Sequence, residues 1–195
     1  METEKIMNSE ESILLIQRMI NTAKEELEDS SFYYLLWGWL VFIACVIHFI
    51  LIRISFQMDS LGWMVLMPLG AIISSIYGYR QGKRQSVQSY ITDIMKYVLI
   101  AFMVSLFMVL LFMNELGLAT YPMVMLIYGI WLFISGGALK FSPLIIGGIL
   151  NWALAIVAMF FVFEIQLIIL AIAVLLGYII PGHLLRLKYR KRKSK

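Results

Sequence analysis

The sequence has little cysteine: Cys45 is the only one among 195 residues. A single thiol excludes disulfides within the chain, and it cannot form a cysteine-based metal cluster. Because it would lie inside an apolar segment, it also gives no information about the redox compartment.

Charged residues are also scarce, and long apolar runs take their place. Asp, Glu, Lys and Arg make up 14% of the chain, whereas hydrophobic residues make up 62% and the mean hydropathy is +0.87. An ordinary soluble domain is roughly 45 to 50% apolar. The chain starts with Glu2 and Glu4 instead of a basic stretch, so we expect no cleaved signal peptide.

Six apolar segments have the length that a transmembrane helix needs. About twenty residues cross roughly 30 Å of hydrocarbon at 1.5 Å per residue. The segments predicted to cross are 32–52, 61–79, 93–113, 121–139, 143–163 and 166–185. The predicted fold class is therefore all-α: a polytopic membrane protein with a six-helix transmembrane bundle over residues 31–185 and an N-terminal cytoplasmic amphipathic helix.

The distribution of cations predicts the orientation of this bundle. The connections after the second and fourth segments hold Arg80, Lys83, Arg84 and Lys140, whereas the connections after the first, third and fifth hold only Arg53. Cation-rich connections stay in the cytoplasm. Both termini are therefore expected on the cytoplasmic side of a bacterial inner membrane.

Residues 186–195 form a polybasic cytoplasmic tail without any acidic residue. Near anionic lipid headgroups, each such cation contributes about 1 kcal/mol to membrane affinity. We therefore predict contacts with anionic lipid, and no nucleic acid partner, for Arg186, Lys188, Arg190, Lys191, Arg192 and Lys193.

Residues 1–30 precede the first apolar segment and carry eight acidic residues against three basic ones. Apolar residues with a heptad-like spacing predict one hydrophobic stripe on a helix here. Three heptads are too few for an autonomous coiled coil, and an acidic helix suits anionic lipid poorly. Packing under the bundle and docking onto another chain, including a second copy in a homo-oligomer, both remain open. The candidate docking face consists of Ile13, Ile16, Ile20, Ala23 and Leu27.

A few polar residues and one proline lie inside the apolar segments. Asn151 must find a hydrogen-bond partner in the membrane, either a neighbouring helix or a solute, and Ser74 and Ser75 are further candidates for a buried polar contact. Pro68 lies within the second segment, where it removes a backbone hydrogen bond and should kink the helix. The kink is either a packing feature or a hinge.

Ionisable residues are missing from the middle of every apolar segment. His48 lies near the outer boundary, and Asp93, Lys96 and His183 lie near the inner one. Catalysis or ion coupling inside a membrane normally requires such residues. No nucleophile with a base, paired carboxylates, metal-ligand cluster or phosphate-binding loop can be assembled. We therefore predict no catalytic residues, no cofactor and no metal site.

Three strings carry a resemblance to other proteins: LLWGWLVFI from Leu35, SIYGYRQGK from Ser75 and GYIIPGHLL from Gly177. They resemble a group of small, uncharacterised six-span bacterial membrane proteins, and the similarity extends over nearly the whole chain. This resemblance implies a cell-membrane location. It implies no activity and no site residues.

The distribution of polar residues leads to two main functional hypotheses. Nearly all of them lie on the predicted cytoplasmic side, which favours a non-enzymatic partner-binding or regulatory membrane module. The alternative is a small transporter or channel for a neutral or apolar solute, which a cavity lined by Asn151 and the serines at 74 and 75 would favour. An intramembrane enzyme ranks third, because no acid–base pair is visible.

Overall fold

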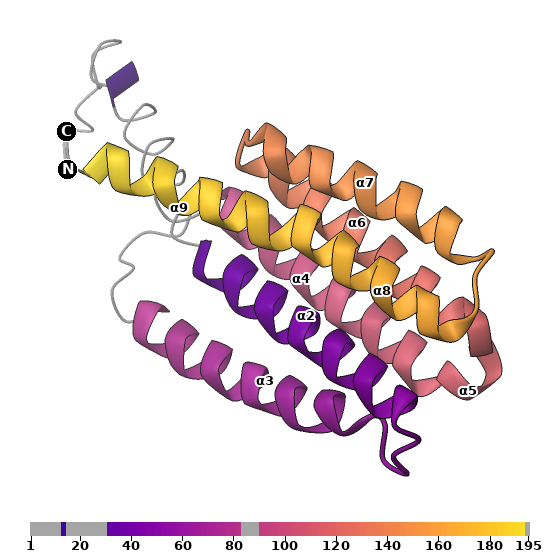
Figure 1. The fold of residues 1–195 in the computed structure, drawn as a ribbon. Coiled ribbons are helices and arrows are strands. Elements are labelled where there is room, and N and C mark those ends of the chain that lie inside the picture. Colours follow the sequence, from indigo (N-terminus) through magenta and orange to yellow (C-terminus); the bar gives the residue numbers. More distant parts are fainter. Residues whose placement is uncertain (1–12, 15–30, 83–89, 194–195) are drawn as a thin grey trace.

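The structure is a computed structural model that describes residues 13–14, 31–82 and 90–193. These residues are helical, with short connections and no strand among them, so the all-α prediction is confirmed for this part of the chain. Figure 1 shows long helices lying side by side as a bundle. The elements are α2 (Ser31–Arg53), α3 (Leu61–Gly82), α4 (Tyr90–Leu111), α5 (Met113–Leu116), the 3-10 helix η1 (Gly117–Ala119), α6 (Thr120–Ala138), α7 (Ser142–Ala158), α8 (Phe163–Val174), the π-helix η2 (Leu175–Ile179) and α9 (Ile180–Lys193).

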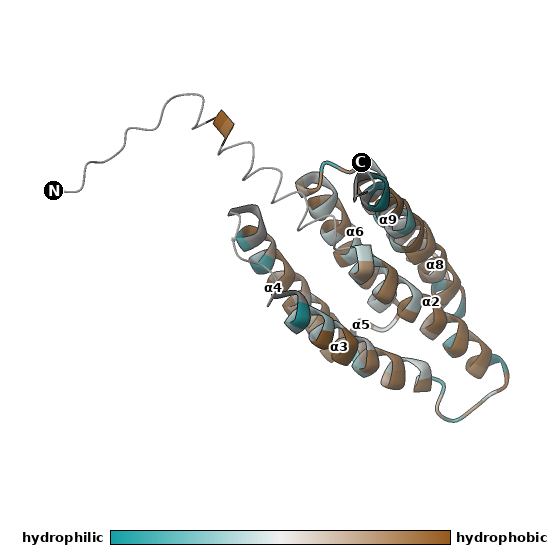
Figure 2. Ribbon diagram, turned by 90° about the vertical axis from the view of Figure 1, so that its left-hand side faces the viewer, coloured by the Kyte–Doolittle hydropathy of each residue, from teal (hydrophilic) through white to brown (hydrophobic). Residues whose placement is uncertain are grey.

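Several helices are long and apolar enough to cross a membrane. Among the described residues, five segments qualify by length and composition: Ser31–Arg53, Leu61–Arg80, Asp93–Leu111, Met113–Ala138 and Phe163–Lys188. The sixth apolar helix, α7, has 17 residues and ends at Ala158, five residues before the expected boundary. Figure 2 shows hydrophobic residues along most of the helices, with hydrophilic residues on α9 and on parts of α3 and α4. These helices support a multi-pass membrane protein.

The turns after α2 and α6 have the same backbone pattern. Lys140 lies in the left-handed region at φ 49°, and the N–H groups of Lys140 and Phe141 donate to the carbonyls of Gly137 and Gly136. After α2, Ser55 at φ 52° takes the equivalent place. This pair of bonds satisfies helix-terminal carbonyls that would otherwise lack partners.

The tightest packing joins α6 and α7 through glycine. A Cβ on Gly148 would lie 2.8 Å from the carbonyl oxygen of Gly129, and a Cβ on Gly136 would lie 2.7 Å from the backbone nitrogen of Ile145. Small residues therefore allow two backbones to approach closely, as is common in membrane helix pairs.

The buried core lies on one side of the bundle. Fully buried side chains such as Met125, Leu132, Leu144 and Leu170 come from α6, α7 and α8, and α2 packs against α3, α8, η2 and α9. The helices α3 and α4 lie at the periphery: α3 packs on α2, and α4 packs on α6. No residue of the apolar stretch 93–111 in α4 is buried. The periphery is therefore the loosely packed part of the described bundle.

Candidate functional site

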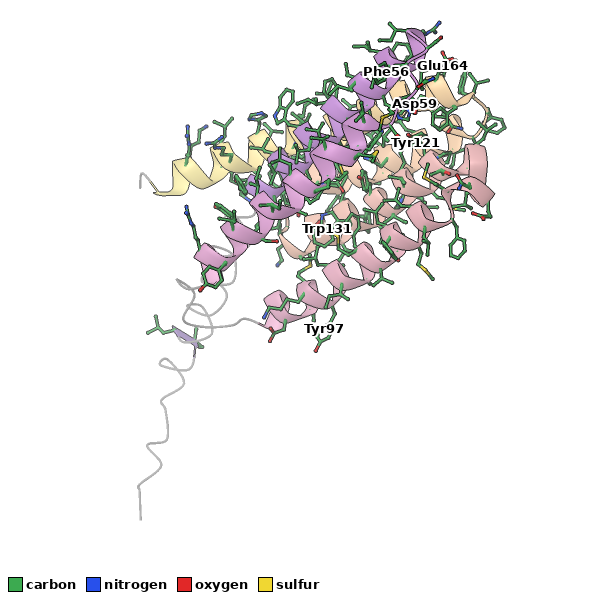
Figure 3. All side chains as sticks on the ribbon, turned by 90° about the horizontal axis from the view of Figure 1, so that it is seen from below. Phe56, Asp59, Tyr97, Tyr121, Trp131 and Glu164 are labelled. Carbon is green, nitrogen blue, oxygen red and sulfur yellow. The ribbon has the colours of Figure 1, made fainter. Side chains whose placement is uncertain are left out.

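A cavity of about 600 Å³ lies between the peripheral helices and the core. Its lining residues come from α2, α3, α4, α6, α8 and η2, together with Leu139. We call this cavity the α3–α4 groove, because α3 and α4 contribute much of its wall and share no extensive contact within the described chain. In Figure 3, Trp131 lies between these two helices, whereas Tyr97 points outward from α4. The volume falls within the roughly 300 to 1,000 Å³ of typical small-molecule sites.

Aromatic side chains dominate the apolar wall of the α3–α4 groove. Phe102 stacks on Tyr128 with ring centroids 5.9 Å apart, and it contacts Trp131 at 5.3 Å. Tyr128 in turn meets Tyr178 edge to face at 5.3 Å. Aliphatic and methionine side chains, including Met67, complete this wall.

The polar groups of the groove fall into two classes. Most have partners: Ser75 donates to the carbonyl of Ala71 at 2.8 Å, Ser135 donates to the carbonyl of Trp131, and Lys96 pairs with Asp93 at 2.9 Å. Two buried hydroxyls, Ser74 Oγ and Tyr178 OH, have no hydrogen-bond partner within the described residues. Groups of this kind are rare in folded proteins, because burial without a hydrogen bond costs free energy.

Tyr178 belongs to the π-helix η2, and the irregular backbone of this segment has a local cause in the sequence. Pro181 has no N–H to donate to the carbonyl of Gly177, so a regular α-helix cannot close there. Instead, the N–H of Ile180 reaches back five residues to the carbonyl of Leu175. Such π turns are often found at functional sites.

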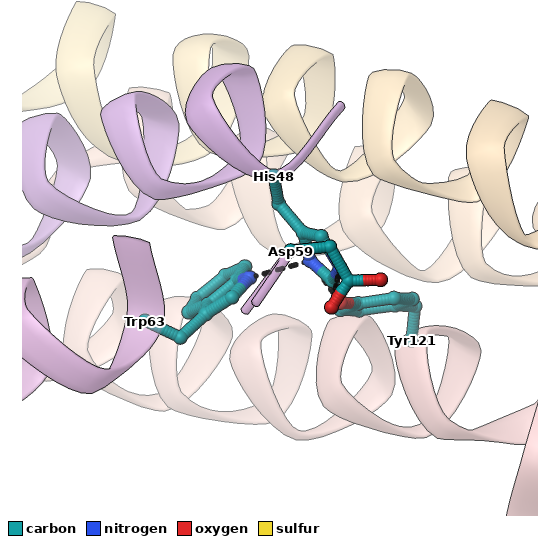
Figure 4. Close-up of polar contacts among 4 residues, drawn as sticks. All are labelled: His48, Asp59, Trp63 and Tyr121. Atoms are coloured by element: carbon teal, nitrogen blue, oxygen red, sulfur yellow. Dashed lines mark hydrogen bonds and ion pairs between the residues drawn. The ribbon is translucent and has the colours of Figure 1, made fainter. Parts of the chain in front are cut away.

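A second polar cluster lies where the loop 54–60 meets the bundle (Figure 4). The indole N–H of Trp63 donates to His48 Nδ1 at 3.0 Å, and the Tyr121 hydroxyl lies 3.3 Å from the same nitrogen. Asp59 Oδ1 lies 3.7 Å from His48 Nε2. Because an indole can only donate, Nδ1 must accept, and the proton of a neutral His48 is on Nε2, facing Asp59.

His48 Nδ1 thus accepts a hydrogen bond while Nε2 lies beside Asp59, and the buried ring packs against Phe163. Nearby, Arg53 at the end of α2 pairs with Glu164 in the first turn of α8 at 3.2 Å. Figure 3 places Asp59 and Glu164 at the same end of the bundle. This cluster joins α2, α3 and α6.

The three residues predicted to make buried polar contacts, Ser74, Ser75 and Asn151, lie in two different parts of the structure. Ser74 and Ser75 both line the α3–α4 groove, whereas Asn151 does not. The Asn151 amide is fully buried and donates to the carbonyls of Gly147 at 2.9 Å and Ala173 at 3.2 Å. It therefore links α7 to α8, which is the packing alternative that the sequence left open. Pro68 lies inside a continuous α3, and its side chain is exposed.

The predicted docking face and lipid contacts are only partly described. Ile13 is exposed, whereas Ile16, Ile20, Ala23 and Leu27 lie outside the described residues. The polybasic tail continues α8 and η2 as helix α9, in which Arg186, Lys188, Arg190 and Lys191 are exposed. Arg192 and Lys193 belong to the same helix, but their side chains are not described.

Sequence reasoning missed two features. It did not connect His48 with Trp63 and Tyr121, although a histidine in an apolar helix requires hydrogen-bond donors and acceptors nearby. It also overlooked Tyr178, for which the signal was the proline three residues later.

No family model, curated protein or solved structure matches the chain.

Proposed function

We propose that the protein binds a neutral, largely apolar small molecule in the α3–α4 groove, as a small transporter for such solutes would. The supporting observation is the cavity of about 600 Å³, lined mainly by apolar and aromatic side chains. The one ion pair at its wall, between Lys96 and Asp93 among the described residues, carries no net charge. This arrangement favours a neutral solute over an ion.

The size of the groove is consistent with a small-molecule ligand. Its cavity of about 600 Å³ lies within the roughly 300 to 1,000 Å³ that is typical of small-molecule sites. The proposal requires no catalytic residue and no resident cofactor.

Photolabelling tests this function directly. The full chain in lipid nanodiscs is irradiated with a diazirine-bearing alkyl probe, and labelled peptides are mapped by mass spectrometry. Labelling should concentrate on groove residues of α4 and fall severalfold in Ala71→Trp, which fills the cavity from α3. Ile72→Trp is the matched control, because Ile72 is exposed and does not line the groove. Uniform labelling of all lipid-facing helices, unchanged in Ala71→Trp, would contradict the proposal.

The membrane arrangement that goes with this function has six crossings in a bacterial inner membrane, with both termini cytoplasmic. With 17 residues, α7 is at the lower limit of crossing lengths. Arg80 lies in the last turn of α3, Lys140 follows α6, and the cations of α9 follow η2. These are the positions at which the chain returns to the cytoplasm in a six-span arrangement.

A second candidate function is a partner-binding or regulatory module on the cytoplasmic side. The observation that favours it is α9, which extends past the other described helices in Figure 1 and carries exposed cations. Acidic residues dominate the segment 1–30, so α9 has complementary charge for that segment or for an acidic partner, as well as for anionic lipid.

Crosslinked pull-down tests this second function. Deleting residues 1–30 should abolish recovery of a partner, including a second copy of the chain. A full-length variant with Arg186→Ala and Arg190→Ala separates the contribution of α9. Unchanged recovery after the deletion would argue against this function and would leave the groove proposal intact.

A further inference from the structure

Two hydroxyls in the α3–α4 groove lack the partners that buried hydroxyls normally have. Tyr178 is 5% exposed and Ser74 Oγ is buried, and neither oxygen has a hydrogen-bond partner in the described chain. Both residues line the same cavity. A buried hydroxyl without a hydrogen-bond partner costs free energy. A ligand that enters the cavity and accepts hydrogen bonds from both hydroxyls would remove this cost.

The backbone around Tyr178 adds an independent reason to examine this position. Tyr178 belongs to the π-helix η2, and the side chain of Pro181, which prevents a regular turn there, is buried. A π turn holds one more residue than an α turn and so changes the direction of the side chains within it. In this chain, Tyr178 lies within the π turn and lines the cavity, and its hydroxyl has no hydrogen-bond partner among the described residues.

The rest of the cavity wall restricts the chemistry of the ligand. Asp93 neutralises the charge of Lys96, so the described wall residues carry no unpaired charge that would favour an ionic ligand. Aromatic rings suit a flat, conjugated group, because rings pack well edge to face or offset-stacked. Six of these rings besides Tyr178 belong to Tyr33, Tyr34, Trp37, Phe102, Tyr128 and Trp131.

The wall also has an apolar portion away from the hydroxyls. Met67 precedes Ser74 by seven residues on α3, which corresponds to about 10 Å along a helix. Leu106 follows Lys96 by ten residues on α4, which corresponds to about 15 Å, toward the same end of the bundle. A ligand with its polar group at Tyr178 and Ser74 would extend an apolar tail toward these residues.

We propose that the ligand of the α3–α4 groove is a neutral amphiphile with a flat, conjugated ring bearing carbonyl oxygens and an apolar tail, which is the chemistry of a membrane quinone. Tyr178 and Ser74 donate hydrogen bonds to the carbonyl oxygens, and the aromatic wall packs against the ring. This inference rests on the proposed binding function and specifies its ligand class. It concerns binding only and involves no change in the ligand.

Competition against the alkyl photoprobe tests the inference on the full chain in nanodiscs of neutral lipid. One competitor is a para-benzoquinone with a decyl tail, and the other is decylbenzene, which has a ring and tail but no carbonyl acceptor. The quinone should displace the probe at a lower concentration than decylbenzene. In Tyr178→Phe and in Ser74→Ala, its half-maximal concentration should rise about fivefold, as expected for the loss of one neutral hydrogen bond.

The controls separate the donor role from general effects. Tyr97→Phe and Ser105→Ala make the same chemical changes at exposed positions outside the groove, and they should leave competition unchanged. Decylbenzene should compete equally in all four variants. Ser74→Ala provides the readout should Tyr178→Phe fail to fold. Equal competition by quinone and decylbenzene, or unchanged quinone competition in the donor variants, would overturn the ligand assignment. Absence of groove labelling by the alkyl probe would instead refute the proposed function itself.

Discussion

At the scale of single residues, His48 shows how an ionisable side chain is accommodated in an apolar helix. Its Nδ1 accepts from Trp63, and its Nε2 faces Asp59. The partners come from α3, from the preceding loop and from α6, so the cluster fixes the connection between α2 and α3. A buried imidazole without these donors and acceptors would be costly.

We expect Trp63→Phe to lower the free energy of unfolding by about 1 kcal/mol, because the variant removes the N–H donor to His48. Trp39→Phe is the matched control, since Trp39 is exposed and packs edge to face on Phe42. Thermal unfolding in detergent measures both variants. A double-mutant cycle with His48→Leu should give a coupling energy of similar size, and a coupling near zero would mean that the bond does not stabilise the fold.

Two adjacent glycines of α6 give a second test at this scale. A Cβ on Gly136 would lie 2.7 Å from the backbone nitrogen of Ile145, whereas a Cβ on Gly137 would meet no atom within 4 Å. Gly136→Ala should therefore destabilise the protein by about 1 to 3 kcal/mol through overpacking. Gly137→Ala should be neutral or slightly stabilising, because alanine favours helix. Equal melting temperatures for the two variants would contradict the close approach of α6 and α7.

At the scale of elements, hydropathy predicted most helices but not their local irregularities. Apolar runs of about twenty residues locate α2, α3, α4 and α6 closely, because a backbone in lipid must close its own hydrogen bonds. The π turn at Leu175–Ile179 was not predicted, since its register depends on Pro181 and on packing from other helices. The same limit applies to the end of α7 at Ala158, because Met159, Phe160 and Phe161 are as hydrophobic as the helix that they follow.

The candidate site was predictable only in part for a related reason. Ser74 and Ser75 were recognised as polar residues in an apolar segment, and both line the groove. Asn151 had the same signal but lies in the packed contact between α7 and α8. The difference comes from which helices lie next to each other, and a periodic pattern along one helix carries no information on that.

Pro68 leads to a prediction for α3 as a whole. It removes one backbone hydrogen bond from the helix that forms a wall of the groove, and its side chain is exposed. Pro68→Ala should therefore leave stability unchanged or raise it. If the proline provides a hinge for ligand entry, the variant should slow the onset of alkyl-probe labelling severalfold while changing the final extent of labelling less. Time-resolved irradiation measures both quantities. Identical kinetics would assign Pro68 to packing alone.

At the scale of the whole molecule, the described chain combines a rigid side and a loose side. The core residues come mainly from α2, α6, α7 and α8, whereas α3 and α4 each contact mainly one neighbour. In a bilayer, lipid-facing apolar surface costs nothing, so α4 can remain unburied without being unstable. This asymmetry explains why the cavity forms beside α3 and α4 and not in the core.

The last prediction concerns the proposed six-span topology, which thiol labelling can test. Cys45 is buried, and Cys45→Ala gives a cysteine-free background. Into it, Gln57→Cys places a thiol in the exposed α2–α3 loop, and Ser142→Cys places one at the exposed start of α7.

With both termini cytoplasmic, a membrane-impermeant maleimide should label Gln57→Cys in intact cells, and should label Ser142→Cys only after permeabilisation. The two positions lie after one and after four crossings, so they must face opposite sides if the cation-rich connections stay inside. Labelling of both thiols from outside would exclude the six-span arrangement, and the reversed pattern would place the cations of α9 on the outer surface, where the attraction to anionic inner-leaflet lipid could not act.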